Sequence, residues 1–305
     1  MRRRMLHTVV PGLVSVDVGN LSARGTYLLS NLRFFPPVAD RLPFHYCVKL
    51  SSDLAAPKEF DFRNAYYSRL DDTWFYERRL ARGLAARFEY NETTRTFTFN
   101  PAYWRLPLEI GGIWPPPRHL ADTIALDLFR AGFDVVRGMA YSLDARVTCC
   151  IAPSFNGKTA LIGTVVARGG SYIAEETLIL DHRTREVYPT GAAHWNYGRK
   201  TNRSASEAIA AAGQDAVQVG KQQIDRLIFF ANHTSTSGAA RLGAADCFLL
   251  NAPVFISNTF AKSRIAADNT AVWLADEIGR RASVWAGDHQ VLQVANYDFS
   301  EILGM

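Results

Sequence analysis

The stretch that most constrains the fold is Val147–Leu180, VTCCIAPSFNGKTALIGTVVARGGSYIAEETLIL. It opens with a β-prone apolar run, Val147–Ile151, which leads into a loop ending in Gly-Lys-Thr, and the apolar segment Ala160–Ala167 follows. This order predicts a strand, a phosphate-binding loop and a helix. The usual loop pattern is G-x-x-x-x-G-K-[ST], and Ala152 stands at the position of its first glycine.

A loop of this kind binds phosphate through backbone N–H groups that converge at a helix N-terminus, where partial positive charge collects. Lys158 is placed to reach the terminal phosphates of a nucleotide. Taken alone, the Gly-Lys-Thr tripeptide is also compatible with a polar turn that leads into a surface helix. The residues that we expect to bind the nucleotide are Ser154, Phe155, Asn156, Gly157, Lys158, Thr159 and Ala160.

A second motif follows the predicted helix. The run Ser171–Ala174 ends in two adjacent carboxylates, Glu175 and Glu176, and another apolar run, Thr177–Leu180, comes directly after them. Two neighbouring carboxylates between apolar strands are costly unless they face a cation or transfer a proton. We therefore expect this pair to act beside the bound phosphates.

The two motifs in this order resemble the catalytic domain of the HPr kinase/phosphorylase family and the related P-loop kinases of the phosphoenolpyruvate carboxykinase group. The resemblance covers about Asp134 to the C-terminus. It implies an α/β (α+β) P-loop kinase core that binds ATP, or another nucleoside triphosphate, together with Mg²⁺. The family pattern reads A-D-D where this chain has Ala174-Glu175-Glu176, and the His common before its loop is absent here, with Arg137 in that region.

The reaction that the resemblance implies is transfer of the γ-phosphate to a hydroxyl group, either a serine of a peptide or protein or a small metabolite. Lys158 offsets phosphate charge, and Thr159, Glu175 and Glu176 are the expected Mg²⁺ ligands. One of the two glutamates would take the proton of the acceptor hydroxyl. Further candidates for binding phosphate or acceptor are the basic residues Arg137, Arg199, Lys200 and Arg203.

Two other functions stay open at this point. A regulatory module that binds nucleotide without transferring phosphate is compatible with the Glu-Glu pair and the missing His. A nucleoside triphosphate hydrolase coupled to a partner is the other alternative. A homo-oligomeric state is also open.

The first half of the chain has a different pattern. Short β-prone runs alternate with polar turns, and Ala85–Tyr90 and Thr96–Phe99 flank a polar turn in the manner of a hairpin. Residues 1–115 are therefore predicted to form a mainly antiparallel β module, with the breaker Gly111–Pro117 at its end. Residues 116–305 would form the kinase-like domain. Its first predicted helix, His119–Ala131, has an amphipathic spacing, and we expect His119 to lie on the surface at the helix start.

The composition limits the kinds of ligand and partner that we expect this protein to bind. The net charge of +5 suits anionic ligands such as nucleotides, but the basic residues are too dispersed to predict nucleic acid binding. No apolar run reaches the length of about 18 residues that a membrane span requires, and the basic N-terminus lacks the apolar core of a signal peptide. We therefore expect a cytoplasmic protein that binds no membrane.

The four cysteines are Cys47, Cys149, Cys150 and Cys247, and their spacing matches no C-x-x-C motif. We expect reduced thiols, with no His partner at metal-ligand distance. Cys149 and Cys150 lie in the strand before the phosphate loop, where small buried residues are the simplest interpretation.

Overall fold

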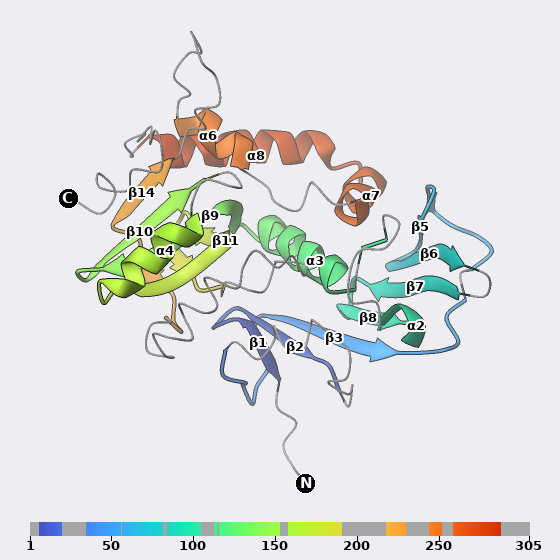
Figure 1. The fold of residues 1–305 in the computed structure, drawn as a ribbon. Helices are drawn as coiled ribbons and strands as arrows, with labels where there is room; N and C mark the ends of the chain where they lie inside the picture. Colours follow the sequence, from blue (N-terminus) through green and yellow to red (C-terminus); the bar gives the residue numbers. More distant parts are fainter. Residues whose placement is uncertain are drawn as a thin grey trace. The chain divides into compact units, whose positions relative to one another are not determined.

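A computed structural model describes residues 6–19, 35–55, 57–81, 84–104, 113–114, 116–152, 158–190, 218–229, 244–251 and 259–287. The chain divides into two compact units, each with its own sheet (Figure 1). The first unit is Met1–Ile124 with Asn196–Gly198 and Ser257–Asn269, and the second is Ala125–Trp195 with Arg199–Ile256 and Thr270–Met305. This division falls inside helix α3 (Pro116–Arg130). A domain boundary between residues 115 and 116 stays a prediction.

The first unit is built on an eight-stranded sheet in the order β1-β2-β3-β8-β7-β6-β5-β4. The β2–β3 and β3–β8 pairs are parallel and the other pairs are antiparallel. The predicted hairpin is confirmed as β7 and β8. The strands are β1 (His7–Val10), β2 (Val14–Asp17), β3 (Phe44–Leu50), β4 (Phe62–Arg63), β5 (Tyr67–Leu70), β6 (Thr73–Ala81), β7 (Leu84–Asn91) and β8 (Thr96–Phe99).

The core of the first unit is a cluster of aromatic rings around His119, which we call the His119 cluster. Helix α2 (Pro101–Trp104) and helix α7 (Thr259–Ala267) contribute rings to it. The His119 ring lies with its centroid 4.8–6.4 Å from those of Phe88, Tyr76, Phe260, Tyr103 and Tyr67. The prediction of a surface position for His119 is therefore wrong, since the residue is 0% exposed.

Helix α3 explains this error. Its apolar spacing predicted one buried face, but nearly every residue with a described side chain is buried, including Asp122 and Thr123. The first half of the helix belongs to the first unit and the second half to the second unit. With both faces of α3 buried, the sequence pattern alone does not identify an exposed face.

The second unit has a six-stranded sheet in the order β13-β12-β11-β9-β10-β14. Only the β10–β14 pair is parallel among these described strands. Helix α4 packs against β9 and β11, and helix α6 packs against α8 (Figure 1). The elements are β9 (Asp134–Leu143), β10 (Arg146–Ile151), α4 (Lys158–Ala167), β11 (Ser171–Asp181), β12 (Glu186–Tyr188), β13 (Gln222–Gln223), β14 (Arg226–Phe229), α6 (Ala244–Asn251) and α8 (Ala271–Ala286).

One face of this sheet is an apolar core. Alternate residues of β10, such as Cys149 and Ile151, pack there with residues of β9, β11 and β14. Helices α6 and α8 cover this face through Phe248, Ala282 and Trp285. Because side chains alternate along a strand, the intervening residues point to the opposite face.

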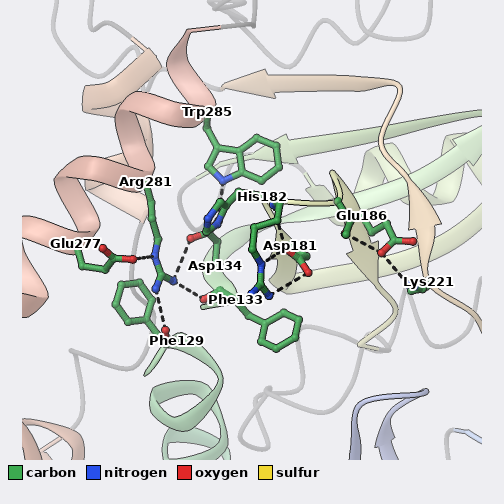
Figure 2. A network of polar contacts seen from close by, with 12 residues as sticks. Phe129, Phe133, Asp134, Asp181, His182, Glu186, Lys221, Glu277, Arg281 and Trp285 are labelled. Atoms are coloured by element: carbon green, nitrogen blue, oxygen red, sulfur yellow. Dashed lines mark hydrogen bonds and ion pairs between the residues drawn. The ribbon is translucent and has the colours of Figure 1, made fainter. Parts of the chain in front are cut away.

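A buried polar network, which we call the Arg281 network, holds the start of β9 (Figure 2). Arg281 of α8 is 2% exposed. Its guanidinium donates hydrogen bonds to the carbonyl oxygens of Phe129 and Phe133 at 2.9 and 2.7 Å. It also pairs with Asp134 at 3.3 Å and with Glu277 at 2.7 Å. Phe129 lies in the last turn of α3, and its carbonyl oxygen accepts hydrogen bonds from both Arg281 and the Gly132 N–H, so Arg281 ties α8 to the end of α3.

Asp134, the first residue of β9, is the fully buried carboxylate of this network, at 0% exposed. Its carboxylate pairs with Arg281, accepts a hydrogen bond from Trp285 Nε1 at 2.8 Å, and lies 3.1 Å from His182 Nδ1 (Figure 2). A buried carboxylate is stable when it is paired and hydrogen-bonded in this way. The network therefore fixes the strand that runs between β10 and β11.

None of the helices in the described ranges combines the length and the apolar character that crossing a bilayer requires. The cytoplasmic location stays a prediction.

Candidate functional site

The candidate site is formed by the segment from β10 through α4 to β11. Strand β10 ends at Ile151, and the next residue, Ala152, donates its N–H to the carbonyl oxygen of Arg137 at 3.1 Å. Helix α4 begins at Lys158, so the lysine of the motif is the first residue of the helix. Both β10 and β11 are antiparallel to β9, which makes β10 and β11 parallel to each other with α4 as their connection.

The acidic pair lies in the middle of one continuous strand. The sequence predicted one strand ending at Glu175-Glu176 and a second one following, but β11 is a single strand of 11 residues. Its ladder with β9 continues from Ala174 to Leu180, with an irregularity between Tyr172 and Ala174. The prediction of two strands is therefore wrong, because β9 supplies hydrogen-bonding partners on both sides of the carboxylates.

Strand register brings the acidic pair level with the end of β10. Gly138 of β9 is the partner of Ile151 on one side and of Glu176 on the other. Met139 is likewise the partner of both Cys150 and Glu175. Two strand spacings separate β10 from β11, so Glu175 and Glu176 lie roughly 10 Å from the last residues of β10.

Gly138 permits close packing at this point. A Cβ atom on residue 138 would lie 2.3 Å from the carbonyl oxygen of Cys150 and 2.6 Å from Leu178 Cδ1. Only glycine avoids both contacts, so the sheet needs Gly138 in the same row as the acidic pair. No local sequence pattern marks Gly138, because its neighbours across the sheet come from other strands of the chain.

Glu175 lies on the face opposite the apolar core under α6 and α8, where it is level with Met139 of β9. Glu175 is 0% exposed. Arg137 of β9 is half-buried and pairs in register with Thr177, which makes Arg137 and Glu175 diagonal neighbours at roughly 7–8 Å. The sheet therefore places a buried carboxylate and a basic residue on one face, close to the end of β10.

The two adjacent cysteines of β10 are fully buried. Burial raises the pKa of Cys150 to about 12, while Arg226 acts in the opposite sense. Burial also raises the pKa of Cys149, with a further contribution from Cys150. Both thiols therefore stay protonated at neutral pH, as expected for core residues.

Part of the predicted site lies outside the described residues. This holds for Ser154, Phe155, Asn156 and Gly157 in the loop and for Arg199, Lys200 and Arg203. The structure describes the backbone of Lys158, Thr159 and Ala160 in the first turn of α4, and of Glu176 in β11. The roles of all these residues stay predictions.

One expectation about cysteines is wrong. Cys47 does have a histidine close by, since its Sγ lies 3.6 Å from His45 Nε2. The two residues are two positions apart on β3 and so share a face of the sheet. The H-x-C spacing within a β-prone run was the signal that could have indicated this pair.

Comparison with known proteins shows a weak structural similarity and no match in sequence. No family model matches the chain, and no characterised protein matches it in sequence. The structure of the Hpr(Ser) kinase/phosphatase from Coxiella burnetii is similar over 34% of this chain and 69% of that chain, at 14% identity and a TM-score of 0.27. The structure of the present chain shows a mixed α/β architecture, and the phosphate-loop kinase core stays a prediction.

Proposed function

We propose that this protein is an ATP-dependent kinase that uses Mg²⁺ and transfers the γ-phosphate to a hydroxyl acceptor. The observation that carries the proposal is the strand register, in which Glu175 and Glu176 lie level with the end of β10. The loop that follows β10 carries the phosphate-binding pattern and leads into α4 at Lys158. In this proposal the phosphates bind beyond the carboxyl end of β10, where α/β proteins commonly bind ligands, and the acidic pair lies on β11, two strands away.

The residues present suit the proposed ligands. Backbone N–H groups in the first turn of α4 favour an anion, and Lys158 adds a positive charge. Oxygen donors are the ligands that Mg²⁺ prefers, and Thr159 offers a hydroxyl. Glu175 and Glu176 are neighbours on one strand and so lie on opposite faces of the sheet, which leaves one of the two to join Thr159 at a single ion. When bound, Mg²⁺ would neutralise the charge of the phosphates.

In this proposal Glu175 is the general base that accepts the proton of the acceptor hydroxyl. Glu175 is 0% exposed, and general bases in enzymes are commonly carboxylates held away from bulk water. Arg137, its diagonal neighbour, would bind phosphate or acceptor. The acceptor class is a serine of a peptide or protein, or a small metabolite with a free hydroxyl.

The test is the substitution Lys158→Ala, measured by calorimetric titration with ATP and Mg²⁺ and by transfer of labelled γ-phosphate to a panel of peptides and metabolites. We expect both ATP affinity and transfer to fall strongly. Arg168→Ala is the matched control, because it removes an exposed positive charge one residue beyond the other end of α4. Unchanged ATP binding and transfer in Lys158→Ala would refute the proposal.

Glu175→Gln separates binding from chemistry. Loss of a general base typically lowers the rate about 100- to 10,000-fold, and we expect ATP to remain bound in this variant. ATP binding by the wild-type protein without any phosphorylated product would favour a regulatory module. Phosphate release without an acceptor would favour a hydrolase. Either outcome would replace the kinase assignment.

A further inference from the structure

Three side chains with metal-binding atoms meet on the first sheet, far in sequence from the proposed nucleotide site. They are Asp17 of β2 and His45 and Cys47 of β3, and one ligand atom from each lies within 4.8 Å of the others. All three side chains are half-buried. An ion therefore has access to them, while the surrounding sheet holds them in place.

The strand pairing explains why these residues meet. Strands β2 and β3 are parallel neighbours, with Ser15 opposite His45 and Asp17 opposite Cys47. These four residues occupy alternate positions of their strands, so their side chains share one face. Two adjacent rungs of the ladder thus supply a carboxylate, an imidazole and a thiol.

The measured separation fits a tetrahedral metal centre. His45 Nε2 and Cys47 Sγ lie 3.6 Å apart. Bond lengths of about 2.3 Å for Zn–S and about 2.0–2.1 Å for Zn–N, at a tetrahedral angle, place nitrogen and sulfur about 3.5 Å apart. The two donor atoms therefore already have the separation that zinc coordination requires.

Two of the three side chains are held by further hydrogen bonds. His45 Nδ1 lies 3.0 Å from Ser15 Oγ, and the same oxygen accepts a hydrogen bond from the Leu42 N–H at 3.1 Å. Asp17 Oδ1 accepts a hydrogen bond from the Gly19 N–H at 2.8 Å. Metal-binding histidines usually donate their second ring N–H to such a partner, which directs the other nitrogen to the metal.

We propose that Asp17, His45 and Cys47 bind a Zn²⁺ ion. A thiolate, an imidazole and a carboxylate are the donors that zinc accepts in proteins, whereas Mg²⁺ and Ca²⁺ prefer oxygen ligands alone. Three protein ligands leave the fourth position for water or another ligand. The carboxylate and the thiolate together balance the charge of the divalent ion.

A nearby cation opposes this charge balance in part. Burial lowers the pKa of His45, Arg41 lowers it further, and Asp17 acts in the opposite direction. Arg41 therefore contributes positive potential at the imidazole. The negative charges of Asp17 and Cys47 offset this positive potential. The same two charges neutralise the divalent ion when it binds.

Cobalt is the probe for this site. The full chain, treated with a chelator and then titrated with Co²⁺, is expected to show thiolate-to-cobalt charge-transfer absorption that saturates at one ion per chain. One equivalent of Zn²⁺ should abolish the band. Zn²⁺ should also slow alkylation of Cys47, measured by peptide mass spectrometry on the wild-type protein, which needs no substitution.

Substitutions identify the ligands. Cys47→Ser should remove the charge-transfer band, and Cys247→Ser is the matched control that removes another thiol and should keep it. Ser15→Ala is expected to weaken Zn²⁺ binding about 10- to 100-fold, because Ser15 only orients His45. Asp17→Asn and His45→Gln should weaken it further. Circular dichroism of each variant without metal confirms that the fold is retained.

Absence of the cobalt band in the wild-type protein, or its persistence in Cys47→Ser, would overturn the proposal, as would alkylation of Cys47 that Zn²⁺ does not slow. The 3.6 Å contact would then be a hydrogen bond between the thiol and the imidazole alone. Lys158→Ala should keep the cobalt band, so this proposal and the proposed kinase activity fail independently.

Discussion

Each unit buries an ionisable side chain at its centre, but the two side chains are stabilised in opposite ways. His119 in the first unit is 0% exposed and Arg281 in the second is 2% exposed. Within the described part of the chain, neither ring nitrogen of His119 has a hydrogen-bond partner. Arg281, in contrast, contacts two carbonyl oxygens and two carboxylates. Among the residues that the structure describes, the first core contains an ionisable side chain without hydrogen-bond partners, and the second contains a charged side chain that is paired with carboxylates and carbonyl groups.

The chemistry of the two side chains explains the difference. An imidazole loses its proton near neutral pH, so burial shifts it to the neutral form, which packs among aromatic rings. Burial lowers the pKa of His119 to about 3, with a smaller contribution from the charge of Arg118. A guanidinium stays charged in proteins and must be paired when buried. Acid should therefore weaken the first unit, and loss of a partner should weaken the second.

The largest expected effect is that of Arg281→Met. Removing one partner of a buried ion pair typically costs about 3–5 kcal/mol, because the other charge stays buried without compensation. Here Asp134 would lose its ion pair with Arg281, and the carbonyl groups of Phe129 and Phe133 would each lose one hydrogen bond. We expect a fall of this size in the free energy of unfolding, measured by guanidinium chloride denaturation.

The matched control is Arg280→Met, at the next position of α8. Arg280 pairs with the same Glu277, but its side chain is 54% exposed. Exposed ion pairs contribute about 0–1 kcal/mol, so this substitution should have little effect. Hydrogen exchange should accelerate in α8 for Arg281→Met while β7 stays protected. Equal costs for the two substitutions would show that the buried network does not stabilise the second unit.

Much of the local structure could be predicted from sequence. The predicted run Thr96–Phe99 has the bounds of β8, Val147–Ile151 lies within β10, and the predicted helix His119–Ala131 corresponds to α3 at Pro116–Arg130. These segments carry their own periodicity of apolar residues. Local pattern was therefore sufficient for the elements themselves.

Sequence could not predict what depends on pairing between distant segments. The row that joins Ile151, Gly138 and Glu176 follows from the register of three strands. The proximity of Asp17 to His45 and Cys47 follows from the register of two. The Arg281 network likewise joins residues about 150 positions apart. Motifs identified the candidate residues, but only the sheet shows which of them are neighbours.

The second prediction concerns acid and the first unit. In the unfolded chain His119 titrates at its ordinary pKa of 6.5, whereas in the folded chain it titrates at about 3. As pH falls below 6.5 the unfolded state gains a proton that the folded state does not, so stability decreases by up to about 1.4 kcal/mol per pH unit. From pH 7 to pH 5 this amounts to about 2 kcal/mol.

His119→Phe tests this contribution, because phenylalanine fills the aromatic cluster without a titratable group. Unfolding free energies of the wild type and the variant are compared at pH 7 and pH 5 by denaturant titration. The difference between the two proteins should shift by about 2 kcal/mol in favour of the variant. A difference that does not change with pH would mean that His119 is protonated within the folded core.

The smallest expected effect is that of Glu277→Gln, which changes stability in a lower pH range than the titration of His119. The pKa of Glu277 in the Arg281 network is lowered to about 2, chiefly by its hydrogen bond with Arg280 and then by Arg281. Its contribution to stability is complete above the unfolded value of 4.5 and is lost as pH falls towards 2. Glu277→Gln should cost about 1 kcal/mol or less at pH 7, and the variant and the wild type should converge near pH 2.

Between pH 6.5 and pH 5, therefore, His119 titrates in the unfolded chain while Glu277 stays ionised in both states. The decrease in unfolding free energy over this pH range should be the same in Glu277→Gln as in the wild type. The difference in unfolding free energy between His119→Phe and a double variant that carries both substitutions should stay constant over the same range. Denaturation at half-unit pH steps measures both quantities. If Glu277→Gln abolishes the loss above pH 5, the acid sensitivity belongs to the Arg281 network, and the assignment of charge exclusion to one core and charge pairing to the other is wrong.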